Sequence, residues 1–169
     1  ETAMLSHGWR RFALLMLAGA IAGLSVPPLF VLPALFIAFP IWVWCLDGAE
    51  KARGWRRLVG PAFGIGFAFG WGYFIVAFHW LGAAFFVDGG LMLALMPFAI
   101  LALSGLIALF WGLGSALAHL FWSHGPWRIV TLATFITLAE WARGHVLTGF
   151  PFDLLGYALT ATDEMMQLA

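Results

Sequence analysis

The longest uncharged stretch of the chain is residues 89–127, GGLMLALMPFAILALSGLIALFWGLGSALAHLFWSHGPW, which contains no Asp, Glu, Lys or Arg. A helix needs about 20 predominantly apolar residues to cross the hydrocarbon of a bilayer. The stretch suits one long, tilted helix with interfacial ends, because its middle carries no turn signal that would divide it into two. We therefore predict a membrane-spanning helix over about 91–122.

Further uncharged stretches surround this one, at 12–46, 58–87 and 129–139. Pro27-Pro28 interrupts the first of them, because proline removes a backbone donor and disfavours helix in the residue before it. The pattern predicts an all-α polytopic membrane protein with about five transmembrane helices and a broken segment at the outer face after the last. The expected helices lie at about 12–26, 29–46, 58–87, 91–122 and 129–146.

The composition excludes several classes of protein. Of 169 residues, 63% are hydrophobic and 9% are charged, with a mean hydropathy of +0.97, too few charges to cover the surface of a soluble enzyme. Eight basic residues balance eight acidic ones, so no nucleic-acid partner is expected. The single cysteine, Cys45, excludes an internal disulfide and a multi-cysteine metal site. We expect no cofactor and no metal.

The basic residues predict the orientation. Seven of the eight fall in three groups, which share one side if the N-terminus is cytoplasmic: Arg10 and Arg11, then Lys51, Arg53, Arg56 and Arg57, then Arg128. The predicted domains are a cytoplasmic N-terminus at 1–11, a helix bundle at 12–146 and an irregular outer-face segment at 147–169 that leads toward a further span. We treat residues 1–3, which precede Met4, as foreign to the natural chain.

Arg143 is the exception to this bias, and it lies in the densest polar cluster. Glu140 and Arg143 are separated by one helical turn and can pair on one face, which lowers the cost of placing both near hydrocarbon. Gly149 and Pro151 then break the helix. Two interpretations remain open for this cluster: a site for a lipid headgroup, and a structural turn locked by a salt bridge.

Other candidates carry weaker signals. His79, beside Trp80, is predicted to be buried at membrane depth, either in a hydrogen bond within the bundle or at a cavity. Glycines between 60 and 72 predict close helix packing, with a groove for an acyl chain as the alternative. Cys45 is interpreted as a small buried residue, since its nearest charge, Asp47, would disfavour a thiolate.

The stretch AEWARGHVLTGFPF (139–152), followed by Leu155-Gly156-Tyr157, resembles the transmembrane signature of apolipoprotein N-acyltransferase. The Pro-Pro hairpin at 23–33 and the glycine-rich helix that ends in HWL (79–81) before DGG (88–90) fit the same family. The sequence departs from it at Phe152, where the family commonly has tryptophan. Phe152 keeps an aromatic ring at this position, but it cannot donate the hydrogen bond that an indole N–H would.

The resemblance implies a multi-pass enzyme of the bacterial inner membrane. Such an enzyme moves a fatty acyl chain from a phospholipid to the N-terminal diacylglyceryl-cysteine of a lipoprotein, and its chemistry belongs to a nitrilase-like domain outside the membrane. This chain lacks that domain, so we expect no catalytic residue here and no activity from the chain alone. Phospholipid and a bacterial lipoprotein are the implied partners. The lipid-binding residues expected are Arg143, Glu140, Trp141, Phe150, Phe152, His79 and Trp80.

An alternative from another class is a truncated, non-catalytic relative that serves as a structural or assembly subunit of a larger membrane complex. Its glycine-rich and aromatic faces suit contact between helices. A transporter fits less well, because transport folds show paired repeats and intramembrane charges.

Overall fold

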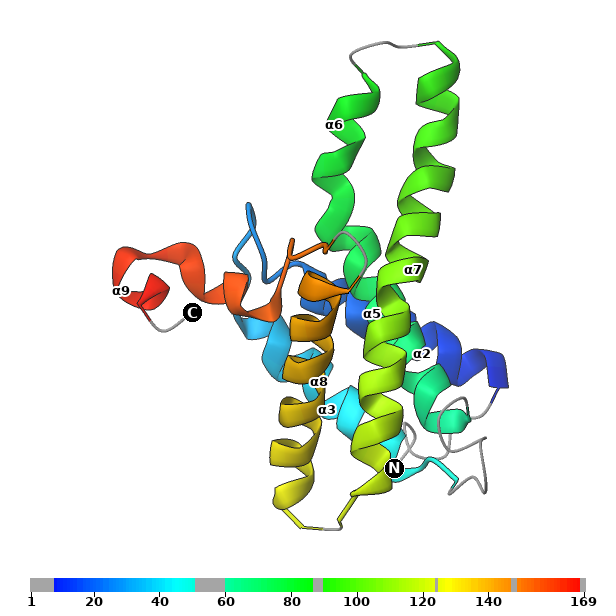
Figure 1. Ribbon diagram of the computed structural model, residues 1–169, viewed down its shortest axis with the longest axis vertical. Helices are drawn as coiled ribbons and strands as arrows, with labels where there is room; N and C mark the ends of the chain where they lie inside the picture. Colours follow the sequence, from blue (N-terminus) through cyan, green and yellow to red (C-terminus); the bar gives the residue numbers. More distant parts are fainter. Residues whose placement is uncertain (1–7, 51–59, 87–89, 124, 147–148, 168–169) are drawn as a thin grey trace.

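The computed structural model describes residues 8–50, 60–86, 90–123, 125–146 and 149–167, and all regular structure within these ranges is helical (Figure 1). The longer helices match the uncharged stretches of the sequence. In chain order the elements are α2 (Gly8–Gly23), α3 (Pro33–Asp47), α5 (Pro61–Ala77), η1 (Phe78–Leu81), α6 (Gly82–Phe85), α7 (Leu91–Leu120), α8 (Trp127–His145), η2 (Leu155–Ala161) and α9 (Asp163–Met166).

Proline determines where several helices begin. Pro33 and Pro61 occupy the first turns of α3 and α5, where their missing N–H has no helical partner to lose. Helix α3 starts later than the predicted residue 29, because the turn after Pro27-Pro28 continues to Phe30, which has a positive φ of 49°. Helix α2 starts earlier than residue 12, since Arg10 and Arg11 are good helix formers and join it.

The prediction of one uninterrupted helix over 58–87 needs correction. The chain is α-helical to Ala77, tightens into the 3₁₀ turn η1, and resumes as the short helix α6. Residues 58, 59 and 87 lie outside the described residues. Tertiary contacts of the aromatic side chains in η1, described below, accompany this change of helical type.

Among the described residues, two helical segments are long and apolar enough to cross a membrane, Pro61–Phe85 and Leu93–Leu120, and Pro33–Asp47 is a shorter apolar helix. Length and composition thus support a membrane-type all-α fold. The basic residues Lys51, Arg53, Arg56 and Arg57, on which the predicted orientation depends, lie outside the described residues.

Helix α5 lies at the centre of the bundle, with α2 and α7 packed against it. The backbones of α2 and α5 approach so closely that a Cβ at Gly19 would overlap the carbonyl of Phe69, and one at Gly72 would overlap the carbonyl of Met16. A Cβ at Gly66 would likewise overlap Ser115 of α7. At Gly66 and Gly72 this confirms the close helix packing predicted for the glycines between 60 and 72. The close approach at Gly19 was not predicted from the sequence.

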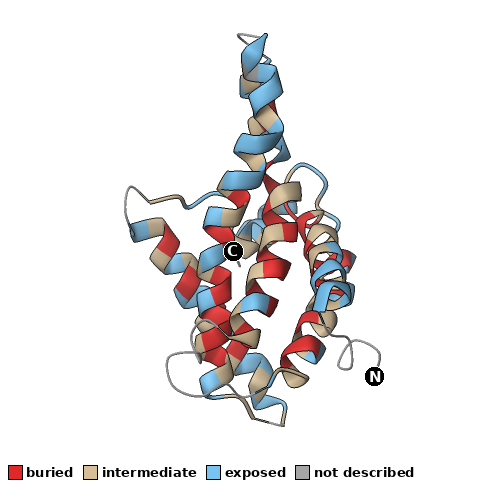
Figure 2. Cartoon of the chain, turned by 90° about the vertical axis from the view of Figure 1, so that its right-hand side faces the viewer, coloured by how far each residue is buried: buried red, intermediate tan, exposed pale blue. Residues whose placement is uncertain are grey.

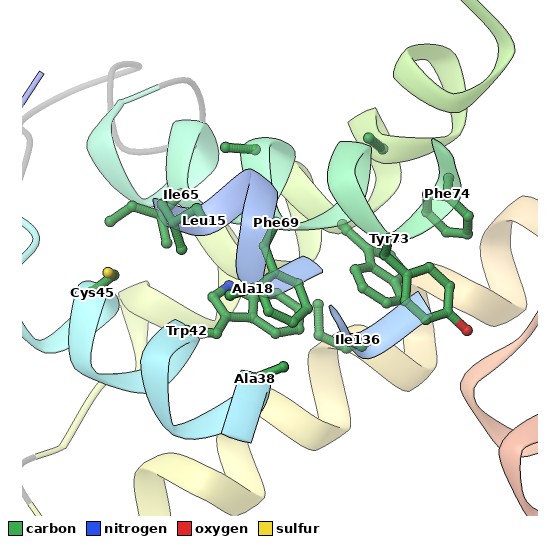
Figure 3. Packing of buried hydrophobic residues seen from close by; sticks show 14 of the residues in the cluster. Leu15, Ala18, Ala38, Trp42, Cys45, Ile65, Phe69, Tyr73, Phe74 and Ile136 are labelled. Carbon is green, nitrogen blue, oxygen red and sulfur yellow. The ribbon is translucent and has the colours of Figure 1, made fainter. Parts of the chain in front are cut away.

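Stacked aromatic side chains fill the core between these helices (Figure 3). The rings of Trp42 in α3 and Phe69 in α5 stack with centroids 4.2 Å apart, and Trp111 of α7 lies 5.4 Å from Trp42. Tyr73 continues the cluster, 4.8 Å from Trp111. Cys45 is buried at one side of this core, as predicted.

Helix α8 is joined to α3 at one end of the bundle. Arg128 Nη1 donates to Asp47 Oδ2 at 2.8 Å, and Trp122 Nε1 donates to Asp47 Oδ1 at 2.9 Å. Asp47 therefore connects the end of α3 to both sides of the α7–α8 connection. We call this the Asp47 end.

The hairpin formed by α6 and the first half of α7 projects beyond the other helices (Figures 1 and 2). Figure 2 shows that most of its surface is exposed. Large apolar side chains make up that surface, among them Phe86, Leu91 and Phe98.

Candidate functional site

The last two turns of α8 carry an acid and a base that face into the protein. Glu140 Oε1 lies 3.7 Å from Arg143 Nη2, and the two side chains are 13% and 0% exposed. Both charged groups point inward, and the exposed face of α8 carries apolar residues such as Val130 and Leu138. The pairing expected from the one-turn spacing is therefore present, and protein covers it.

Arg143 fastens the chain that follows α8. Its Nη1 donates to the carbonyl of Phe152 at 2.8 Å and to that of Phe150 at 3.2 Å. The backbone N–H of Phe150 in turn donates to the carbonyl of Arg143 at 2.8 Å. The guanidinium also lies over the ring of Phe74, 5.0 Å from its centroid. Within the described residues, Nε and Nη2 make no hydrogen bond.

Residues 149–155, which we call the post-helix segment, are held at two further points. Glu140 Oε1 accepts the backbone N–H of Leu155 at 3.1 Å. The hydroxyl of Tyr157 donates to the carbonyl of Pro151 at 3.2 Å. Non-helical backbone in an apolar setting needs such partners, because each unsatisfied N–H or C=O is costly there. The acid–base pair and its neighbours supply them.

Asp153, which the sequence analysis did not single out, is the second buried carboxylate of this region. Its side chain accepts the indole N–H of Trp80 at 2.9 Å, and its carbonyl accepts the hydroxyl of Tyr73 at 3.2 Å. Its φ of 51° is left-handed, a conformation that Asp tolerates better than most residues. Burial raises the pKa of Asp153, opposed by the Trp80 hydrogen bond and by the nearby Arg143 guanidinium.

Four aromatic rings lie beside these polar groups. Phe150 contacts Phe78 and Phe152, with ring centroids 5.4 and 5.1 Å apart. Phe152 lies 6.0 Å from Trp80. Trp80 and Phe152 are 43% and 47% exposed, so this pair forms an accessible aromatic surface above the buried network.

The structure brings together five of the seven predicted site residues: Glu140, Arg143, Phe150, Phe152 and Trp80. Trp141 does not join them. It is 63% exposed on another face of α8 and stacks on His145, with centroids 4.6 Å apart.

The prediction that His79 is buried at membrane depth is wrong. Its ring is exposed on η1, and Nδ1 forms a hydrogen bond with the carbonyl of Val76 at 2.9 Å. His79 lies on the 3₁₀ turn Phe78–Leu81, where the continuous α-helix expected from the sequence is interrupted.

Neither Asp153 nor Tyr73 was found from the sequence. One signal in the sequence could have identified Asp153: it is a carboxylate in an apolar stretch, directly after the motif at 139–152. Tyr73 offered none, since it lies among aromatic residues of similar size. In the part of the chain that the structure describes, no three His, Cys, Asp or Glu side chains converge as metal ligands would.

Comparison with known proteins identifies the family of this chain. Residues 18–169 match the family described as the apolipoprotein N-acyltransferase N-terminal domain. The chain is 47% identical over 157 residues to an apolipoprotein N-acyltransferase of Rhodopseudomonas palustris, with 93% of this chain and 29% of that protein aligned. It is 42% identical to the protein of that name from Rhizobium etli, with 100% and 32% aligned.

The corresponding protein of Brucella suis is 41% identical, with 97% of this chain and 31% of that protein aligned. The chain thus spans about a third of the length of these relatives and matches their N-terminal part. It belongs to the family of apolipoprotein N-acyltransferase N-terminal domains.

Proposed function

We propose that this chain is the membrane portion of an apolipoprotein N-acyltransferase of the bacterial inner membrane. In the complete protein it would anchor the catalytic domain and guide phospholipid to it, so that an acyl chain passes to the N-terminal diacylglyceryl-cysteine of a lipoprotein. The family match supports the reaction class. The observation that carries a lipid role for this chain is the buried Glu140–Arg143 network beneath an exposed aromatic pair.

The proposal includes about five membrane crossings, with the N-terminus in the cytoplasm. Helix α8 supports it, although its charges lower its hydropathy. Its 19 residues extend about 28 Å, close to the hydrocarbon thickness. Two of its hydroxyls are satisfied within the helix, because Thr131 donates to the carbonyl of Trp127 and Thr134 to that of Val130. This lowers the cost of placing these two side chains near lipid.

Arg143 is the proposed anchor for a lipid phosphate. Its Nη1 edge is occupied by backbone carbonyls, whereas Nη2 has Glu140 at 3.7 Å, beyond hydrogen-bonding distance. Because Arg143 is buried in the structure, a phosphate would reach this edge only after the covering post-helix segment moves aside. It would then compete with Glu140, and arginine suits phosphate because its planar fork can donate two parallel bonds. Trp80, Phe150 and Phe152 would line the acyl path, whereas Trp141 lies on another face of α8.

The test compares two arginines of the same helix in the full-length protein. Arg143→Ala should lower acyl transfer from phospholipid by at least tenfold, roughly what loss of one charge-assisted contact costs. Arg128→Ala, which breaks the ion pair at the Asp47 end, is the matched control and should leave the rate per folded molecule near that of the parent. An Arg143→Ala protein with unchanged lipid affinity and rate would remove Arg143 from the site.

A structural role in a larger membrane complex is the second candidate, and the exposed apolar hairpin of α6 and α7 favours it. Co-purification of a stoichiometric partner in mild detergent, lost when Phe98 is changed to Ser, would support this role. A monodisperse protein that binds phospholipid and no partner would contradict it.

A further inference from the structure

Two parts of the chain that are distant in sequence meet beside η1. The turn Phe78–Leu81 faces the post-helix segment, and two ring contacts join them. Among the described residues, one hydrogen bond connects the two parts, from Trp80 Nε1 to Asp153 Oδ2 at 2.9 Å. Because Trp80 is nearly half exposed and lies on a four-residue turn, packing alone restrains its ring weakly.

The acceptor, in contrast, is rigidly placed. The carbonyl of Asp153 is bonded by Tyr73 of α5, and the preceding carbonyl, that of Phe152, is bonded by Arg143 of α8. Two helices therefore hold the backbone on which the carboxylate is mounted. The hydrogen bond therefore fixes the orientation of the Trp80 indole, because the backbone that carries its acceptor is held in place.

We propose that Asp153 is a positioning residue, which holds the Trp80 indole so that Trp80 and Phe152 together present one apolar surface to a lipid acyl chain. The inference rests on the proposed function, in which this pair lines the acyl path. The geometry indicates the mode of action: with its N–H edge turned to Asp153, Trp80 turns its hydrocarbon surface away from the buried network and beside the ring of Phe152.

Fluorine NMR can test this on the intact protein labelled with 5-fluorotryptophan. The protein is placed in bilayer discs of phosphatidylethanolamine and phosphatidylglycerol, with and without a phosphatidylcholine that is spin-labelled on its acyl chain. The Trp80→Phe variant identifies the Trp80 resonance. In the parent, the spin label should broaden this resonance, since the ring contacts acyl chains.

Two substitutions at Asp153 separate the carboxylate from the backbone. Asp153→Gly removes the acceptor but favours the positive φ, and Asp153→Asn keeps an oxygen acceptor and tolerates the same φ. We expect Asp153→Gly to shift the Trp80 resonance and to reduce its broadening about two- to tenfold, the range that loss of one hydrogen bond allows. Asp153→Asn should restore most of the parent signal, which a general loss of stability would not do.

The Trp141 resonance is the internal control, because this exposed residue of α8 contacts His145 rather than Asp153. If the Trp80 resonance and its broadening are the same in Asp153→Gly as in the parent, the positioning role is overturned and the proposed acyl path stands. If the parent shows no broadening at Trp80, both the acyl path and the positioning role are overturned.

Discussion

The two ends of α8 each bury an arginine–carboxylate pair, and they use it differently. At the Asp47 end the atoms are 2.8 Å apart, the carboxylate comes from another helix, and the arginine side chain is 29% exposed. At the other end, which we call the Arg143 end, the separation is 3.7 Å, the carboxylate lies on the same helix, and the arginine is fully buried. The first pair joins two helices, whereas the second supports irregular backbone.

This difference has a physical reason. Arg128 can reach water when its partner is lost, so its charge need not be satisfied by protein alone. Arg143 is fully buried and cannot reach water in this way. Its charge is stabilised by two backbone carbonyl groups, which would themselves lack this hydrogen bond without it. The Arg143 end is therefore a mutually dependent network, and the Asp47 end is a local connection.

The largest expected effect is at Arg143. Arg143→Met should lower the free energy of unfolding by about 3–5 kcal/mol, because it leaves the Glu140 carboxylate buried without a cation. Adding Glu140→Gln should recover part of this loss by neutralising that carboxylate. Reversible unfolding of the single and double variants in mixed micelles would measure both. Additive losses in the double variant would show that the two side chains do not act as a unit.

Asp47 should be less sensitive. Asp47→Ala removes the acceptor of two hydrogen bonds, yet Arg128 can turn to water, so we expect a loss of about 1–3 kcal/mol. The same unfolding measurement compares it directly with Arg143→Met. The distinction between the two ends would fail if Asp47→Ala cost as much.

A smaller effect is expected for Tyr73, whose hydroxyl bonds the Asp153 carbonyl from α5. Tyr73→Phe keeps the ring in the core and removes one neutral hydrogen bond, so it should cost about 1 kcal/mol. Tyr157→Phe, which removes a similar bond from a more exposed hydroxyl, is its matched control and should cost less. Equal losses would indicate that burial does not strengthen the bond at Tyr73.

The smallest effect is on the pH dependence of stability. Burial raises the pKa of Asp153, so the folded protein binds this proton more tightly than the unfolded chain does. Stability from this group is therefore present below the ordinary aspartate pKa of about 4 and is lost as the pH rises through the raised value. In Asp153→Asn this part of the pH dependence should vanish. The prediction would be contradicted if the free energy of unfolding changed with pH in the same way in Asp153→Asn as in the parent.

The helices could be predicted from the sequence because charge gaps and prolines are local signals. Leu91–Leu120 form one helix within the uncharged stretch 89–127, Pro33 and Pro61 begin two others, and the Glu140–Arg143 pairing follows from helical periodicity. The burial of His79 was predicted wrongly, because a 3₁₀ turn of four residues leaves no mark in a run of apolar residues.

Local sequence patterns therefore specify the all-helical, apolar character of the chain and the motif at its last long helix. The groups that Arg143 and Asp153 contact depend instead on how distant segments pack together. Trp80 and Tyr73 are 73 and 80 residues away from Asp153 along the chain. A hydrogen bond depends on where two atoms lie in space, and no local pattern records the approach of η1 and α5 to the segment after α8.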